Sequence, residues 1–166
     1  MTTREGLSLN SWPPEELLGI SPLTNWAKNK LDNDPPEKLV IDSNGVGAGV
    51  YSNLKEVGYP VIGFRGGEAQ IMLSEEAKFA NLKSQAYWNL RSLFEKGEIN
   101  IQKVPNYKKL VSELSTIKYD FDSKGKIIVK REKDKKSPDF ADALSLCCFG
   151  PYLSAQKLGV ALVDIW

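Results

Sequence analysis

The sequence predicts a single α/β domain, spanning residues 1–166, in which helices flank a mixed sheet. Apolar patterns typical of strands alternate along the chain with patterns typical of helices, without an internal repeat. Residues 38–64 form a strand, helix, strand unit, which requires parallel strands, whereas residues 117–130 have the pattern of an antiparallel hairpin. A chain of 166 residues that is 42% hydrophobic and 26% charged has the size and composition of one domain with its own core.

The first half of the chain is expected to contain three strands and two helices. In residues 6–12, Leu7 and Leu9 alternate with polar residues, which indicates a short strand that stops at the following prolines. Residues 21–31 open with a serine cap and a first-turn proline and predict a helix. The strand KLVID follows at 38–42, then apolar residues at helical spacing up to Gly58, then the strand YPVIGF.

The second half is expected to contain three helices, a short strand and a hairpin. Residues 79–94 predict the longest amphipathic helix, stopped by Gly97, and EINIQ predicts a short strand. A further helix carries apolar residues from Tyr107 to Ile117, and Gly125 supplies the turn of the hairpin. In SPDFADAL, the serine and proline predict the cap and first position of a last helix.

Composition excludes several kinds of chemistry. The chain contains no histidine, which excludes a Ser/His/Asp triad, a Cys/His pair and a histidine-ligated zinc. Cys147 and Cys148 are adjacent, a spacing unsuited to a structural disulfide or a zinc site, and we expect them to be buried thiols. No apolar run approaches the roughly 20 residues of a membrane span, and no secretory signal is recognisable, so a cytosolic protein is expected.

Three glycines follow Asp42 in KLVIDSNGVGAG and raise the question of a dinucleotide site. A dinucleotide fingerprint requires the spacing G-x-G-x-x-G, but the third glycine comes one residue early, at Gly49. The carboxylate of Asp42 would also repel a pyrophosphate in a poorly solvated crevice. The pattern therefore disfavours a nucleotide cofactor and suggests that the glycines only allow a tight turn.

An aspartate at the end of a buried strand suits a hard divalent cation, which binds carboxylate oxygens. Asp139 lies in the first turn of the last predicted helix and would be a second ligand, with Asp142 as a third or supporting group. Each acid also has an ordinary structural interpretation. Asp42 could hydrogen-bond within its loop, Asp139 could interact with the helix dipole, and Asp142 could be an exposed surface acid.

The formal net charge of +1 is unevenly distributed. Residues 118–136 hold eight basic and four acidic side chains, so this segment carries +4 and the remainder −3. Such a segment is either a solvated hairpin or a surface that meets a phosphate backbone without reading its sequence.

Four stretches in this order resemble the nuclease domain of the large terminase subunit of tailed bacteriophages. They are VIDSNGVGAGVYSNLKEVGYPVIGF, FANLKSQAYWNLRSLFEKGEINI, STIKYDFDSKGKI and SPDFADAL, and the resemblance covers about residues 6–149. It implies a ribonuclease H-like fold, shared with Holliday-junction resolvases, with a hairpin insertion before the last acidic motif. Asp42 matches the second acidic motif of this family and Asp139 the third, with Asp142 as its neighbour.

The resemblance also implies a function and its partners. Family members are two-metal endonucleases, with Mg²⁺ or Mn²⁺, that cut concatemeric double-stranded DNA during packaging in the bacterial host cell. Their partners are the small terminase subunit, the portal and an ATPase domain, whereas this sequence has no ATP site. The basic residues implied to contact DNA phosphates are Lys124, Lys126, Lys130, Arg131, Lys133, Lys135 and Lys136.

One departure from the family leaves two functional hypotheses. The first metal-binding aspartate of the family lies on an opening strand that has no counterpart here, so the first strands are expected to be missing. Residues 6–12 resemble the third strand instead. The chain is then either a phage or prophage endonuclease domain, impaired by this loss, or a catalytically inactive DNA-binding or assembly module.

Overall fold

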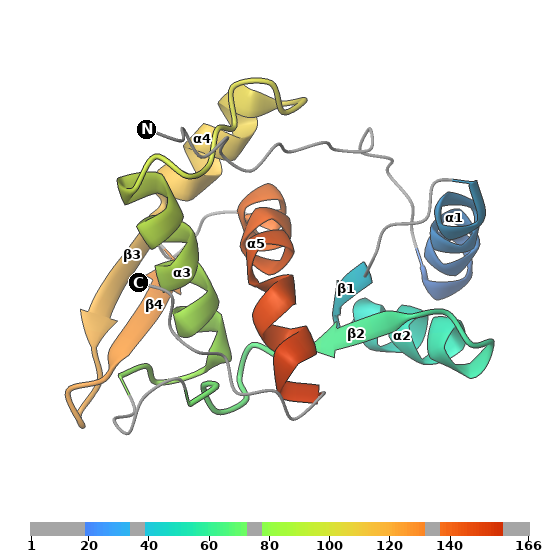
Figure 1. Cartoon of the computed structure of the whole chain (residues 1–166), viewed down its shortest axis with the longest axis horizontal. Helices are drawn as coiled ribbons and strands as arrows, with labels where there is room; N and C mark the ends of the chain where they lie inside the picture. The colour runs from blue at the N-terminus through green and yellow to red at the C-terminus, as the bar shows by residue number, and fades with distance from the viewer. Residues whose placement is uncertain (1–18, 34–38, 73–77, 132–136, 158–166) are drawn as a thin grey trace, which may run out of the picture. The chain divides into compact units, whose positions relative to one another are not determined.

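The computed structural model describes residues 19–33, 39–72, 78–131 and 137–157 (Figure 1). The chain divides into two compact units. The first, here called the parallel-strand unit, contains the described residues up to 66 and those from 150 onward. The second, here called the hairpin unit, contains the described residues from 67 to 149. A single domain over residues 1–166 stays a prediction, as does the strand at residues 6–12, which lies outside the described residues.

The parallel-strand unit contains the predicted strand, helix, strand arrangement. Its described elements are α1 (Ile20–Asn33), β1 (Leu39–Asp42), α2 (Val46–Glu56) and β2 (Val61–Phe64). The two strands are parallel, with register from Leu39 opposite Val61 to Asp42 opposite Phe64. This confirms the crossover expected from the sequence, because α2 provides the connection that two parallel strands need.

The core of the parallel-strand unit lies between α1 and α2. Ala27 and Leu31 from α1 are buried with Val50 and Leu54 from α2, at the helical spacing seen in the sequence. Val57 is 56% exposed although it continues the same spacing, because α2 ends one residue before it.

The hairpin unit contains three helices and an antiparallel pair of strands. Its elements are α3 (Leu82–Glu95), α4 (Tyr107–Ser115), β3 (Ile117–Phe121), β4 (Ile127–Arg131) and α5 (Asp139–Lys157), whose last residues belong to the other unit. Ile117 lies opposite Arg131 and Phe121 opposite Ile127. Gly125 has a φ of 72°, which confirms its predicted role in the turn.

An apolar core joins the helices of the hairpin unit. The buried residues come from α3, α4, α5 and the segment between the first two helices: Tyr87, Leu90, Ile99, Ile101, Leu110, Ala141, Leu144 and Cys148. The side chain of Asn81 accepts a hydrogen bond from the Ser84 amide and caps α3. Parallel and antiparallel strands with helices beside them confirm the α/β class and the hairpin before the last acidic motif.

Several local expectations were wrong. The helix predicted to start at residue 79, α3, begins only at Leu82, because Phe79 forms an isolated bridge with Ile127. The longest described helix is α5, with 19 residues. Residues 98–102 form none of the strands that the structure describes, but Ile99 forms a β-bridge, and Ile99 and Ile101 are buried as their alternation predicted.

The two adjacent cysteines differ in their exposure to solvent. Cys148 is buried, but Cys147 is exposed, because neighbouring helical residues point in directions about 100° apart. Burial raises the pKa of the Cys148 thiol to about 12, so it stays protonated at neutral pH.

Among the described residues, no helix is long and apolar enough to cross a membrane.

Candidate functional site

Asp42 occupies the last position of β1, as predicted, and its carboxylate is exposed. Its Oδ1 atom accepts hydrogen bonds from the Asn44 amide (3.2 Å) and from Asn44 Nδ2 (2.7 Å). The loop interpretation of Asp42 is therefore correct for one oxygen. Oδ2 accepts no hydrogen bond from any described residue, so it is available to a ligand.

The chain after Asp42 is packed tightly against the end of β1. The Ser43 amide and hydroxyl both donate to the Phe64 carbonyl, at 2.8 and 3.0 Å. A Cβ atom on Gly47 would lie 1.9 Å from the Asp42 carbonyl oxygen. The space beside Gly47 is therefore occupied by the protein's own backbone and does not form a cradle for a dinucleotide, which agrees with the expected tight turn.

The first turn of α5 brings the other two acids into different environments. Asp139 is exposed, and its carboxylate makes no hydrogen bond or ion pair with the described residues. Asp142 is half-buried, and its Oδ1 accepts from the Tyr87 hydroxyl (2.7 Å) and from Lys83 Nζ (2.8 Å). The interpretation of Asp142 as an ordinary exposed acid is therefore wrong, and its charge is compensated by Lys83.

Tyr87 is a donor to Asp142 over the whole physiological pH range. Burial, together with the hydrogen bond to the Asp142 carboxylate, raises the pKa of Tyr87 far above its ordinary value of 10.0. The phenol therefore keeps its proton and orients the carboxylate. Because both contacts go to Oδ1, the Oδ2 atom of Asp142 has no partner among the described residues.

Glu113 of α4 caps α5, a role that the sequence had assigned to Ser137. The Oε2 atom of Glu113 accepts from the amides of Phe140 (2.8 Å) and Ala141 (3.0 Å). The helix begins at Asp139, one residue later than predicted, with the Asp142 amide donating to the Pro138 carbonyl. A carboxylate from another helix thus satisfies the free amides that a local serine was expected to bind.

The first turns of α3 hold both α5 and the hairpin. Ser84 is fully buried, and its hydroxyl oxygen accepts a hydrogen bond from the Val129 amide of β4 at 2.9 Å. Its neighbour Lys83 and, one turn later, Tyr87 bind Asp142. None of these three residues was predicted from the sequence to support the site. The i, i+4 spacing of Lys83 and Tyr87 was a signal that they share one face of a helix, but not what that face contacts.

The three predicted metal-binding acids are divided between the units. Asp42 belongs to the parallel-strand unit, and Asp139 and Asp142 belong to the hairpin unit. Within either unit, the described residues contain no cluster of three or more His, Cys, Asp or Glu side chains that could hold a metal ion. The convergence of Asp42 with Asp139 on one cation therefore stays a prediction.

The hairpin carries part of the predicted phosphate-binding set. Lys124 and Lys126 lie at its turn, and their ammonium groups make no ion pair with the described residues. Arg131 is exposed at the end of β4, whereas Lys130 is paired with Asp120 at 2.7 Å. The remaining members of the set, Lys133, Lys135 and Lys136, lie outside the described residues.

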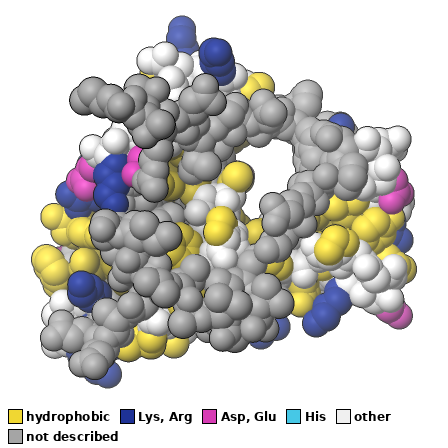
Figure 2. All heavy atoms as spheres, in the orientation of Figure 1, with side chains coloured by type: hydrophobic (Ala, Val, Ile, Leu, Met, Phe, Trp, Pro, Cys, Tyr) yellow, Lys and Arg dark blue, Asp and Glu magenta, His cyan; other side chains and the backbone are white. Residues whose placement is uncertain are grey.

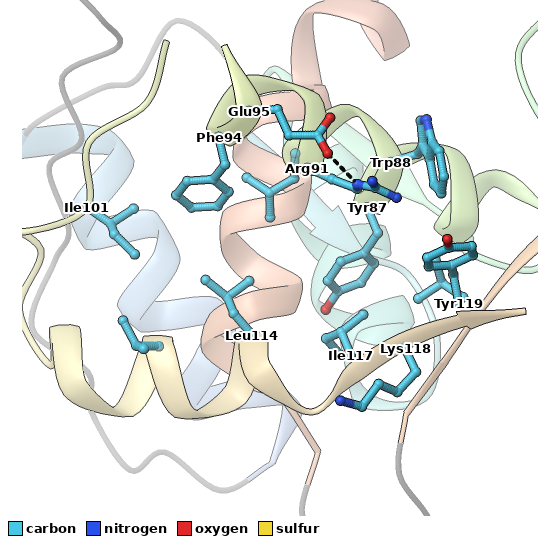
Figure 3. Close-up of a pocket in the computed structure, with 13 residues that line it drawn as sticks. Tyr87, Trp88, Arg91, Phe94, Glu95, Ile101, Leu114, Ile117, Lys118 and Tyr119 are labelled. Carbon is cyan, nitrogen blue, oxygen red and sulfur yellow. Dashed lines mark hydrogen bonds and ion pairs between the residues drawn. The ribbon is translucent and has the colours of Figure 1, made fainter. Parts of the chain in front are cut away.

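An open pocket of about 410 Å³ lies in the hairpin unit between α3, α4 and β3 (Figure 3). Its lining is mostly apolar, with Phe94, Ile101 and Leu114 pointing into it. Among the described residues that line it, Glu95 is the only acid, and it is paired with Arg91 at 2.8 Å. The pocket therefore lacks the two carboxylates that a metal site of the predicted kind requires.

Solved nuclease domains of phage terminases share the fold of this chain. The nuclease domain of the large terminase subunit gp2 of bacterial virus Sf6 matches with a TM-score of 0.62 and 22% identity, over 80% of this chain and 74% of that chain. A mutant of that domain with manganese matches with a TM-score of 0.63, 23% identity, and 80% and 75% coverage. The large terminase nuclease from thermophilic phage G20c with bound magnesium matches with a TM-score of 0.54, 21% identity, and 79% and 61% coverage.

These matches confirm the fold that the sequence resemblance implied: the chain has the fold of a terminase nuclease domain. No protein-family model and no curated protein matches the sequence.

Proposed function

We propose that this chain is the metal-dependent endonuclease domain of a phage or prophage terminase and cleaves concatemeric double-stranded DNA during genome packaging. The observation that carries the proposal is the fold, which this chain shares with terminase nuclease domains. Asp42 lies at the carboxyl end of β1 with one carboxylate oxygen available, and Asp139 is exposed in the first turn of α5. Ligands of open α/β sheets bind beyond the carboxyl ends of the strands.

The donor set fits Mg²⁺ or Mn²⁺, because it consists of carboxylate oxygens without histidine or thiolate. Asp42 and Asp139 would hold the metal, and Asp142, oriented by Tyr87 and Lys83, would support it. In the Sf6 and G20c structures, manganese and magnesium accompany the nuclease domains. Bound cations supply activation of water and stabilisation of the leaving oxygen.

The remaining residues of the chain bind and orient the substrate in this proposal. Lys124, Lys126 and Arg131 contact DNA phosphates without reading sequence, and affinity falls as salt rises. Ser84 holds β4, while Lys83 and Tyr87 hold α5, so α3 keeps these cations in a constant position relative to Asp139. The small terminase subunit, the portal and an ATPase domain are the partners this function implies, in the cytoplasm of the host cell.

The competing candidate is a DNA-binding or assembly module without catalytic activity. The ion pair between Lys83 and Asp142 favours it, because it compensates the charge of one of the three predicted acids. Carboxylates with compensated charge attract a cation less strongly.

A plasmid-nicking assay separates these candidates. We expect the intact chain with Mn²⁺ to nick supercoiled plasmid, and Asp42→Asn and Asp139→Asn to reduce the rate by at least about 100-fold, because each removes a metal ligand. Glu56→Gln, at the end of α2, is the matched control and should retain the activity. Salt-dependent DNA binding without nicking would support the inactive module. Absence of both binding and nicking would contradict the endonuclease and the DNA-binding module and would leave only an assembly role.

A further inference from the structure

Two aromatic side chains of β3 are unusually exposed. Tyr119 and Phe121 expose 52% and 59% of their surface. They are two positions apart on a strand and therefore lie on the same face of the hairpin. We call this pair the aromatic ridge. Figure 2 shows hydrophobic and basic side chains side by side on the left of the molecule, where Figure 1 places β3 and β4.

The ridge is anchored at one end and free at the other. The Tyr119 ring packs edge-on against Trp88 of α3, with centroids 5.3 Å apart, and the Arg91 guanidinium lies over both rings, at 5.5 and 4.6 Å (Figure 3). The Phe121 ring contacts the Tyr119 ring edge-on, with centroids 6.2 Å apart, and makes no other ring contact with the described residues. Phe121 is the last residue of β3 and directly precedes the turn. Tyr119 is thus a rigid support, and Phe121 presents its ring to a partner.

The charge around Phe121 identifies the kind of partner. Residues 117–131 contain five basic and two acidic side chains. Asp120 is paired with Lys130, and the Asp122 carboxylate accepts from the backbone amides of Lys124 and Lys126. The ammonium groups of these two lysines form no ion pair with a described residue, although their positive charges help to lower the pKa of Asp122. A hairpin that combines an exposed aromatic ring with a net positive charge is complementary to a nucleobase and its phosphates.

We propose that Phe121 stacks on a nucleobase of bound DNA, with Tyr119 supporting its ring and Lys124 and Lys126 contacting the adjacent phosphates. This inference rests on the proposed DNA-binding function and adds a contact that the basic residues alone do not provide. Stacking on a protein ring requires the base to leave its neighbours in the duplex. The hairpin therefore prefers DNA in which a base is already unpaired, regardless of its sequence.

The test measures binding by fluorescence anisotropy in EDTA, so that neither metal nor cleavage contributes. The probes are a perfect duplex, the same duplex with one unpaired base, and a single strand of equal length. We expect the intact chain to bind the last two probes more tightly than the perfect duplex. Phe121→Ala should weaken binding to them by about 5-fold to about 100-fold, the range seen for base stacking on aromatic residues. Phe121→Trp should restore the affinity.

The matched control is Tyr107→Ala, which removes a 39% exposed aromatic ring from α4 of the same unit and should leave all affinities unchanged. Lys124→Gln with Lys126→Gln should lower the salt dependence for every probe, whereas Phe121→Ala should not change it. Circular dichroism of each variant verifies the fold.

Three results would overturn the inference. The first is that Phe121→Ala binds each probe with the same affinity as the intact chain, while the lysine substitutions still lower the salt dependence. The DNA-binding function would then stand without a role for the aromatic ridge. The second is a changed oligomeric state of Phe121→Ala in light scattering with unchanged DNA affinity, which would assign the ridge to a protein interface. The third is no DNA binding by the intact chain, which would refute the DNA-binding function as well. Base stacking without nicking would refute only the nuclease function.

Discussion

The carboxylates of Asp42 and Asp142 are oriented by two different kinds of contact. Asp42 is held by Asn44, two residues later, in a turn that Gly47 makes possible. Asp142 is held by Tyr87 and Lys83, more than fifty residues earlier in the chain. The first position therefore depends on local backbone geometry, and the second depends on the packing of α3 against α5.

This comparison predicts where each site is vulnerable. A substitution next to Asp42 should act through the backbone and affect the whole parallel-strand unit. A substitution remote from Asp142 should alter the orientation of that one carboxylate and leave the helix in place.

The largest effect is expected for Gly47→Ala. The new Cβ would lie 1.9 Å from the Asp42 carbonyl oxygen, and a backbone atom at the end of β1 cannot move without disturbing its pairing with β2. We expect a loss of about 3 kcal/mol or more in the free energy of unfolding, measured by urea denaturation. Gly67→Ala is the control, because a Cβ there meets no atom within 4 Å and should change stability by less than about 0.5 kcal/mol. Equal free energies of unfolding for the two variants would show that the close approach of Gly47 to Asp42 does not determine the stability of this unit.

A smaller effect is expected for Tyr87→Phe, which removes only the hydroxyl that donates to Asp142. Loss of a partly buried hydrogen bond to a charged group should lower the free energy of unfolding by about 1–2 kcal/mol, measured by urea denaturation. The exposed phenol of Tyr107 provides the control, since Tyr107→Phe should have no measurable effect. If Tyr87→Phe also leaves the free energy of unfolding unchanged, the contact with Lys83 alone orients Asp142.

The smallest effect concerns the hairpin and its response to acid. The hydrogen bond from Lys130 lowers the pKa of Asp120, and the amide of Lys126 lowers that of Asp122, both from an ordinary value of 3.8. A carboxylate with a lower pKa in the folded state stabilises the fold above its unfolded pKa and loses this contribution as pH falls through the folded value. Hairpin stability should therefore be constant above about pH 5 and decline below about pH 4.

Amide exchange of β4 between pH 3 and 7, corrected for the intrinsic pH dependence of exchange, measures this effect. Asp122→Asn is the matched variant and should show a smaller decline in acid, because only Asp120 remains to be protonated. A decline of the same size in both proteins would assign the acid sensitivity to other carboxylates.

The sequence determined the features of the molecule that depend on neighbouring residues. The parallel strands on either side of α2, the hairpin with its turn at Gly125, and the positions of Asp42 and Asp139 at the ends of their elements all follow from short-range periodicity and turn chemistry. The role of the glycines beside Asp42 also followed from their spacing, because the steric demand of a tight turn is local.

Only the tertiary structure decided which side chains support these elements. Glu113 rather than Ser137 caps α5, Lys83 compensates Asp142, and Ser84 holds the hairpin. Each of these contacts joins residues that lie far apart in the chain, and their geometry is set by how the helices pack. Periodicity identifies the face on which a side chain lies, but the partner of that face depends on the docking of whole elements, which no local pattern encodes.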